Sequence, residues 1–161
     1  MIGRREFAVT GLSAVALAAL EGSAFAQAPA AEKGAVAGAV HAEHDSMLQA
    51  CAQACSDCQR ACDMCSTHCA HKLAEGHKEH MASLGTCRDC ADFCATAAQI
   101  VSRGGPFSTE ICKGCAEACA QCAAACEKFP DDAHMKACAA ECRKCEKACR
   151  EMVSHAAHAH G

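Results

Sequence analysis

Tryptophan and tyrosine are absent from this chain, so its five phenylalanines make up the whole 3% content of Phe, Trp and Tyr. Lysine and arginine form no cluster, and the formal net charge is only −4. Proteins that hold nucleic acids use basic patches, and many stack bases on aromatic side chains. With both features lacking, we expect no nucleic-acid binding.

The chain also lacks a good membrane span. Residues 8–20 are apolar, but the run is shorter than the roughly 20 residues that a bilayer requires, and it is rich in small side chains. We therefore interpret this run as part of a targeting segment and expect no membrane-spanning segment in the mature protein.

The targeting segment has the features of a twin-arginine signal. Arg4 and Arg5 precede Phe7 in an R-R-x-F pattern, and an A-x-A cleavage site ends at Ala26. We expect residues 1–26 to be a cleaved signal peptide that directs the protein to the periplasm. Because the twin-arginine route exports folded proteins, thiols would be organised before they leave the reducing cytoplasm.

Large apolar side chains are scarce as well. After residue 26 the chain has 17 Leu, Ile, Val, Phe and Met residues, fewer than its 18 cysteines. Free cysteine behaves as a small hydrophobic residue, so it supplies only part of a core. We expect bound metal or oligomerisation to provide some of the stability.

Cysteine is what the chain has in abundance, and its spacing is helical. The first six cysteines follow each other at steps of 4, 3, 4, 3 and 4 residues, with a mean of 3.6, the period of an α-helix. In an ordinary amphipathic helix such a stripe holds Leu, Ile and Val and faces the core. The eighteen cysteines form four stripes: Cys51, Cys55, Cys58, Cys62, Cys65 and Cys69; Cys87, Cys90 and Cys94; Cys112, Cys115, Cys119, Cys122 and Cys126; Cys138, Cys142, Cys145 and Cys149.

The stripes predict an all-α fold, an antiparallel up-down-up-down four-helix bundle with a cysteine-lined core, because short loops join the helices. Asp45 or Ser46 is the expected N-cap of the first helix, Gly76 its stop, and Asp131 or Asp132 the cap of the last. The expected helices run over about 46–75, 77–103, 108–128 and 132–155. Residues 27–45 are expected to be a linker or short N-terminal helix, 46–156 the bundle and 157–161 a His-containing tail.

A disulfide-stapled structural bundle is one interpretation of the thiols, since the count is even and the protein is expected to be exported. Neighbours three or four residues apart on a helix have Cβ atoms about 5–6 Å apart. A disulfide requires about 3.8 Å, so every bridge would have to join two helices. Simple apolar filling does not account for eighteen thiols, and a redox enzyme would need one C-x2-C pair that stands apart.

Metal binding is the other interpretation. Iron–sulfur clusters need four converging thiolates, often from irregular loops, and a di-iron bundle needs inward Glu-x-x-His units, which the chain lacks. Zinc prefers separate sites of four ligands, whereas Cu(I) is selected by soft thiolates and accepts two or three. A continuous stripe therefore favours many Cu(I) ions, on the order of half to two-thirds of the thiol count. A zinc or general thiophilic-metal detoxification protein stays open as an alternative.

The ends of the stripes carry further soft or borderline ligands. The first stripe continues toward the N-terminus and the last stripe toward the C-terminus, and these two ends are neighbours in an antiparallel bundle. The four residues reached in this way are an expected metal entry: His44, Met47, Met152 and His155. In a second interpretation the two methionines only close the core. The opposite end has its own set: His77, His80, His134 and Met135. His68 and His71 fall off the thiol face and are expected at the surface or between subunits.

The unit C-x3-C-x2-C-x3-C begins at Cys51, Cys58, Cys115 and Cys138. With the twin-arginine signal, this pattern resembles the exported branch of the bacterial copper storage proteins over essentially the whole mature chain. The resemblance implies a four-helix bundle that fills its interior with many Cu(I) ions, held mostly by pairs of cysteines. It also implies a homotetramer that supplies copper to exported copper enzymes or a chaperone, with metal entering past His44 and Met47.

The sequence thus predicts a periplasmic protein that stores and buffers Cu(I) without enzymatic turnover. Every cysteine is an expected ligand, and metal binding should release thiol protons. Helix 77–103 carries only three cysteines, so we expect its part of the column to borrow ligands from neighbouring helices.

Overall fold

The computed structural model describes the backbone of residues 33–159 and the side chains of residues 44–156. This part of the chain contains four α-helices, one short 3-10 helix and no β-strand. The elements are α1 (Lys33–Ala74), η1 (Lys78–His80), α2 (Met81–Ser102), α3 (Ser108–Cys126) and α4 (Ala133–Ala159). The predicted all-α class is confirmed. The predicted signal peptide lies outside the described residues.

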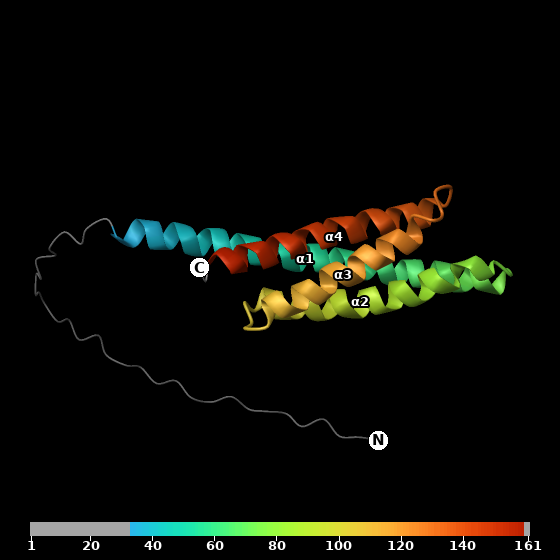
Figure 1. Ribbon diagram of the computed structural model, residues 1–161, viewed down its shortest axis with the longest axis horizontal. Helices are drawn as coiled ribbons and strands as arrows, with labels where there is room; N and C mark the ends of the chain where they lie inside the picture. Colours follow the sequence, from blue (N-terminus) through green and yellow to red (C-terminus); the bar gives the residue numbers. More distant parts are fainter. Residues whose placement is uncertain (1–32, 160–161) are drawn as a thin grey trace, which may run out of the picture. The chain divides into compact units, whose positions relative to one another are not determined.

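The helices run alternately up and down (Figure 1). The α1–α2 and α3–α4 turns lie at one end of the bundle, and the α2–α3 turn lies at the other, near the end of α4. Around the bundle, α1 packs on α2 and α4, and α3 packs on the same two helices. Short connections force this antiparallel order. We call the end with the α1–α2 turn the His80 end and the opposite one the His155 end.

A glycine ends the first helix and an aspartate begins the last one, as the conformational preferences of these residues predict. Gly76 follows α1 with φ of +98°, a conformation that side chains with a Cβ rarely adopt. Asp132 caps α4, because its Oδ1 accepts hydrogen bonds from the backbone N–H groups of His134 (2.9 Å) and Met135 (3.2 Å). Both predicted boundaries are confirmed, with Asp132 rather than Asp131 as the cap.

Other predicted boundaries are wrong. Helix α1 begins at Lys33, so neither Asp45 nor Ser46 is its N-cap. Residues 33–45 contain no proline and several alanines, and alanine is the best helix former. For the same reason α4 continues to Ala159, through part of the segment predicted as a tail. The helix expected over residues 77–103 begins later in the structure. The 3-10 helix η1 precedes it, so α2 begins only at Met81.

The core is made of sulfur and small apolar groups. Each of the eighteen cysteines is at most 2% exposed. Alanines fill the spaces between the helices, and a few larger side chains close the core, among them Leu48, Val101, Met135 and Met152. Charged residues lie outside, where pairs such as Arg143–Glu127 (2.8 Å) are exposed and add little stability. Among the described helices, none has the length and apolar character of a membrane span.

Candidate metal centre

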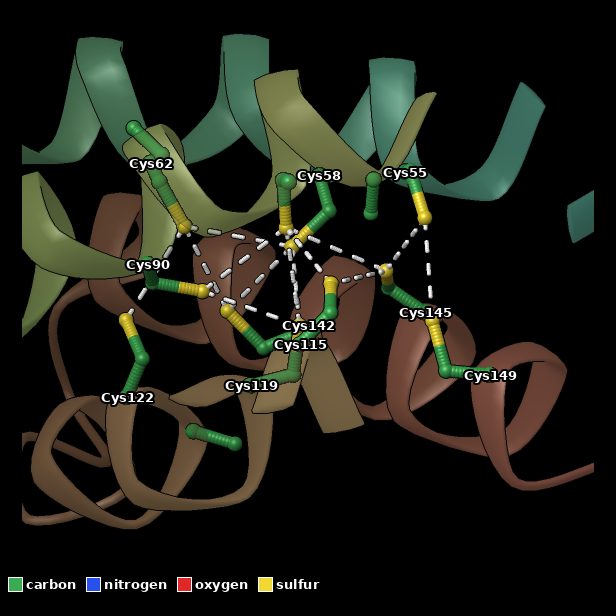
Figure 2. Close-up of a cluster of buried hydrophobic side chains, with 14 of the residues drawn as sticks. Cys55, Cys58, Cys62, Cys90, Cys115, Cys119, Cys122, Cys142, Cys145 and Cys149 are labelled. Carbon is green, nitrogen blue, oxygen red and sulfur yellow. Dashed lines mark hydrogen bonds between the residues drawn. The ribbon is translucent and has the colours of Figure 1, made fainter. Parts of the chain in front are cut away.

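All eighteen cysteines are free thiols, and together they form a column along the bundle axis. The cysteines labelled in Figure 2 come from all four helices, and their side chains point toward one another. Sulfur atoms from different helices approach within 3.5–4.0 Å, as in Cys62–Cys142 (3.5 Å), Cys55–Cys149 (3.6 Å) and Cys51–Cys112 (3.7 Å). These separations exceed the S–S bond of about 2.03–2.05 Å in a disulfide. They are of the size that separates two ligands of one metal ion.

Groups of four sulfur atoms, each within 4.8 Å of the others, follow one another along the column. Three of these groups share no member: Cys55, Cys115, Cys145 and Cys149; Cys58, Cys90, Cys94 and Cys119; Cys62, Cys122, Cys138 and Cys142. Two further groups overlap with them: Cys58, Cys62, Cys90 and Cys142; Cys65, Cys87, Cys126 and Cys138. The column could therefore hold metal ions in separate sites of four cysteines each. It could equally hold a continuous series of ions in which neighbouring ions share cysteine ligands.

Helix α2 carries only three cysteines, and the sulfur atoms of all three lie close to thiols of α3. Cys94 lies 3.6 Å from Cys115 and 3.6 Å from Cys119, measured between sulfur atoms. Cys87 lies 3.5 Å from Cys122. Each α2 thiol thus has a sulfur neighbour on an adjacent helix, although its own helix contributes few.

The thiols influence one another's ionisation. Hydrogen bonds from Cys112 and Cys149 lower the pKa of Cys51, because they stabilise its thiolate. Hydrogen bonds with Cys122 and Cys138 raise the pKa of Cys62, where the thiol is the donor. At the His80 end, burial and the neighbouring charge of Cys65 raise the pKa of Cys69 to about 12. Since the ordinary pKa of a cysteine thiol lies above neutral pH, a metal ion must displace protons from the thiols that it binds.

A methionine ends the sulfur column at the His80 end. Met135 on α4 is fully buried, and its Sδ lies 3.5 Å from the Cys65 sulfur and 3.7 Å from the Cys69 sulfur. The sequence indicated Met135 only as one of several ligands at that end. The structure adds that its thioether is continuous with the thiols, so it offers a soft, uncharged donor at this end of the column.

Three of the four predicted entry residues meet at the His155 end. His44, Met152 and His155 line a cavity of about 220 Å³, together with the α2–α3 turn. The rings of His44 and His155 have centroids 6.4 Å apart, and both side chains are exposed. Met152, in contrast, is buried. Met47 does not line the cavity but packs, half-buried, against the core, as its interpretation as a core residue predicts.

The His80 end brings His68 together with His134, one of the histidines that the sequence placed there. His68 is half-buried, and its Nε2 lies 2.7 Å from Oδ2 of Asp132. Burial acts to raise the pKa of Asp132, but the hydrogen bonds from His68 and the α4 backbone outweigh it, so the pKa is lowered. His68 also stacks on His134, with centroids 4.7 Å apart. This contact joins residues 64 apart in sequence, so the His68 side chain is partly covered within its own chain. Its expected place at the surface or between subunits stays a prediction.

Known proteins share this architecture. The family model of the copper storage protein matches residues 43–154, and a cysteine-rich protein of Bacillus subtilis without assigned function is 39% identical over 84 residues, which cover 52% of this chain and 76% of that protein. The Cu(I)-bound copper storage protein BsCsp3 is 39% identical with a TM-score of 0.60, over 66% of this chain and 98% of its own.

A cytosolic copper storage protein from Streptomyces lividans, in a structure with five coppers, has a TM-score of 0.65. It is 27% identical, over 70% of this chain and 97% of its own. A further structure of the Streptomyces lividans copper storage protein is loaded with 10 copper equivalents. The family match covers the whole cysteine column, and these structures share its helical framework. The chain belongs to the copper storage protein family.

Proposed function

We propose that this protein stores and buffers multiple Cu(I) ions on the thiolates of its core. The observation that carries the proposal is the uninterrupted column of sulfur atoms 3.5–4.0 Å apart, drawn from all four helices. Because Cu(I) is soft and accepts two or three ligands, it can use every neighbouring pair along such a column. The proposed ligands are all eighteen cysteines of the four stripes, with Met135 as an additional donor at the His80 end.

The relatives support the same cargo. BsCsp3 is described with Cu(I) bound, and the Streptomyces lividans protein is described with five coppers and with 10 copper equivalents. For eighteen thiols we estimate about ten Cu(I) per chain, which lies within half to two-thirds of the thiol count. The protein has no turnover in this proposal. Its work is thermodynamic, because binding energy and displaced protons set how tightly each ion is held.

Metal enters, in this proposal, at the His155 end. His44 and His155 are exposed and line the cavity, and Met152, which also lines it, is buried in the same core cluster as the thiols. Imidazoles and thioethers hold Cu(I) more weakly than thiolates do, which favours transfer inward over retention. Met47 packs, half-buried, against the core and does not line this cavity.

Export, assembly and delivery complete the proposal. The segment with Arg4, Arg5 and Phe7 supports twin-arginine export to the periplasm, followed by supply of copper to exported copper enzymes. The Streptomyces lividans relative is described as cytosolic, so export depends on this chain's own N-terminal segment rather than on the family. Fusing residues 1–26 to a reporter and replacing both arginines with lysine tests the route, with loss of export as the expected result. Native mass spectrometry tests the homotetramer.

Zinc storage is a second candidate because three groups of four cysteines share no member. Zinc prefers such closed four-ligand sites. Anaerobic loading of the reduced protein with an equimolar excess of Zn(II) and Cu(I), followed by gel filtration and metal analysis, separates the two. Copper storage predicts about ten retained copper ions and little zinc. Retention of three or four zinc ions in preference to copper would refute copper storage.

A count of reactive thiols in freshly purified protein tests the disulfide-stapled bundle. Few reactive thiols would favour that bundle.

A further inference from the structure

A groove between α2 and α3 lies over the middle of the sulfur column. The two helices run side by side (Figure 1), with a cavity of about 280 Å³ between them. We call it the α2–α3 groove, and four residues of each helix line it: Thr86, Asp89, Cys90 and Phe93; Gly114, Glu117, Ala118 and Gln121. Sites for drug-sized ligands measure about 300–1,000 Å³, so a groove of this volume suits a small molecule.

Cys90 connects this groove with the metal centre. Its sulfur lies 3.6 Å from that of Cys119, and it belongs to two groups of four sulfur atoms that both include Cys58. Cys58 is the third of the six cysteines of α1, so Cys90 stands near the middle of the column, far from both ends. A metal ion bound there passes several further thiols on its way to either end of the bundle. The α2–α3 groove is the shorter way out.

The ring of Phe93 covers the groove. Phe93 follows Cys90 by three residues, so the two side chains share a face of α2, and helical side chains lean toward the N-terminus of their helix. The ring also reaches α3, where a Cβ added to Gly114 would lie 3.0 Å from its Cε1 atom. Phe93 is 42% exposed, whereas Cys90 is fully buried. The ring therefore stands between solvent and Cys90.

The contact with the ring explains the glycine inside α3. Glycine weakens a helix interior, and Gly114 lies well within the helix. A Cβ at that position would press on the ring, because carbon atoms pack best at about 3.5–4.0 Å. Glycine thus lets the ring lie across the groove. Exposed side chains change rotamer within picoseconds to nanoseconds, so a half-exposed ring seated in this way can swing aside.

The groove also has a negative charge. Asp89 and Glu117 line it, and no lysine or arginine does. Glu117 accepts a hydrogen bond from the neutral side chain of Gln121 at 3.0 Å, which leaves its charge uncompensated there. Carboxylates attract a cation, and the face of the nearby aromatic ring adds a cation–π contact. The α2–α3 groove therefore favours a small cation over an anion.

We propose that the α2–α3 groove is a lateral exchange site, at which a small thiol with a positively charged amino group takes Cu(I) from Cys90. The ammonium group binds beside Asp89 and Glu117, the ring of Phe93 swings aside, and the soft sulfur of the thiol becomes a ligand of the ion. The thiol proton passes to the Cys90 thiolate as the Cu–S bond to Cys90 breaks, so no electron is transferred. This exchange rests on the proposed storage of Cu(I) and adds to it a route and a ligand class for release.

Labelling of the reduced apo protein tests the groove without copper. The trimethylammonioethyl and sulfonatoethyl methanethiosulfonates are similar in size and opposite in charge, and each transfers its thioalkyl group to a thiolate with release of methanesulfinate. With substoichiometric reagent, peptide mass spectrometry gives the initial rate at each cysteine. Cys90 should react faster than Cys58, which is equally buried and belongs to the same groups of four but does not line the groove.

Variants test the two parts of the groove. Phe93→Ala should raise the labelling rate at Cys90 several-fold, whereas the control Phe107→Ala, which removes an exposed phenylalanine from the α2–α3 turn, should leave it unchanged. After correction for the reactivity of each reagent with a free thiol, the cationic reagent should be favoured about tenfold at low salt. Asp89→Asn/Glu117→Gln should remove that preference.

Copper-loaded protein tests the exchange itself. Cysteamine and mercaptopropionate, a cationic and an anionic thiol, are added at equal thiolate concentration, and gel filtration with metal analysis follows the copper that stays bound. Cysteamine should remove copper faster in the wild type but not in Asp89→Asn/Glu117→Gln. Phe93→Ala should speed the removal without changing the loaded capacity, because Phe93 is not a ligand.

The outcomes separate this exchange from storage. Equal labelling of Cys90 and Cys58, a charge preference that survives in Asp89→Asn/Glu117→Gln, or copper release that is unchanged in Phe93→Ala would each overturn the lateral site. Absence of retained copper in every protein would instead refute storage, and the exchange with it, whatever the labelling of the apo protein shows.

Discussion

Removing one close pair of thiols from the middle of the column should lower the copper capacity by a calculable amount. Cys62 and Cys142 are fully buried, with sulfur atoms 3.5 Å apart, and both belong to two groups of four. The double variant Cys62→Ala/Cys142→Ala removes two of eighteen thiols. At half to two-thirds of an ion per thiol, it should bind about one Cu(I) fewer than wild type.

The same variant has a predictable cost in stability. Each substitution deletes one buried heavy atom, a change comparable with Ile→Val, which costs about 0.5–1.5 kcal/mol. The free energy of unfolding of the apo protein should therefore fall by about 1–3 kcal/mol. Val101→Ala is the matched control, because it deletes two heavy atoms from a fully buried side chain that carries no metal ligand. It should lose similar stability and no copper.

Gel filtration of the copper-loaded proteins followed by metal analysis gives the capacities, and urea unfolding of the apo proteins gives the stabilities. Full capacity in the double variant would refute the assignment of these thiols as ligands. An equal loss of copper in Val101→Ala would show that capacity follows stability rather than ligand number, which would also contradict the reasoning.

Three further predictions concern the ends of the bundle. Asp132→Ala should lower the free energy of unfolding by about 1–2 kcal/mol through loss of the α4 cap together with the contact to His68, while the exposed Asp131→Ala changes it by less than about 0.5 kcal/mol. Urea unfolding in which the two variants match would contradict the cap. The pKa of Cys69 is raised from 9.0 to about 12, so the protonated thiol stabilises the folded apo protein below pH 9, and this stabilisation is lost as the pH rises toward 12. Melting temperatures of the apo protein that do not fall between pH 9 and 12 would contradict this prediction. His44→Ala/His155→Ala should slow Cu(I) uptake in stopped-flow measurements and leave the final capacity unchanged, and an unchanged rate would remove these residues from the entry path.

Periodicity made the core of this protein predictable. The 3.6-residue spacing of the cysteines places every thiol on one face of its helix, and all eighteen are buried in the structure. Gly76 and Asp132 act at the predicted helix boundaries because each has a local mechanism, a positive φ in one case and a side-chain cap in the other.

Contacts between distant segments were not predictable in the same way. The start of α1 at Lys33 was missed because alanine-rich sequence continues a helix without any periodic signal. The pairing of His68 with Asp132, and the stacking of His80 on Phe129, depend on how the α1–α2 and α3–α4 turns meet. Stripe spacing fixes which face of a helix is buried, but not which side chains meet across its ends.

The most direct test of copper storage is an anaerobic titration of the reduced protein with Cu(I) in the presence of a competing chromogenic chelator. Storage on the sulfur column predicts that the protein withholds about ten equivalents before the chelator colours, in line with half to two-thirds of its thiols. Immediate colour, or colour after only one or two equivalents, would contradict the account.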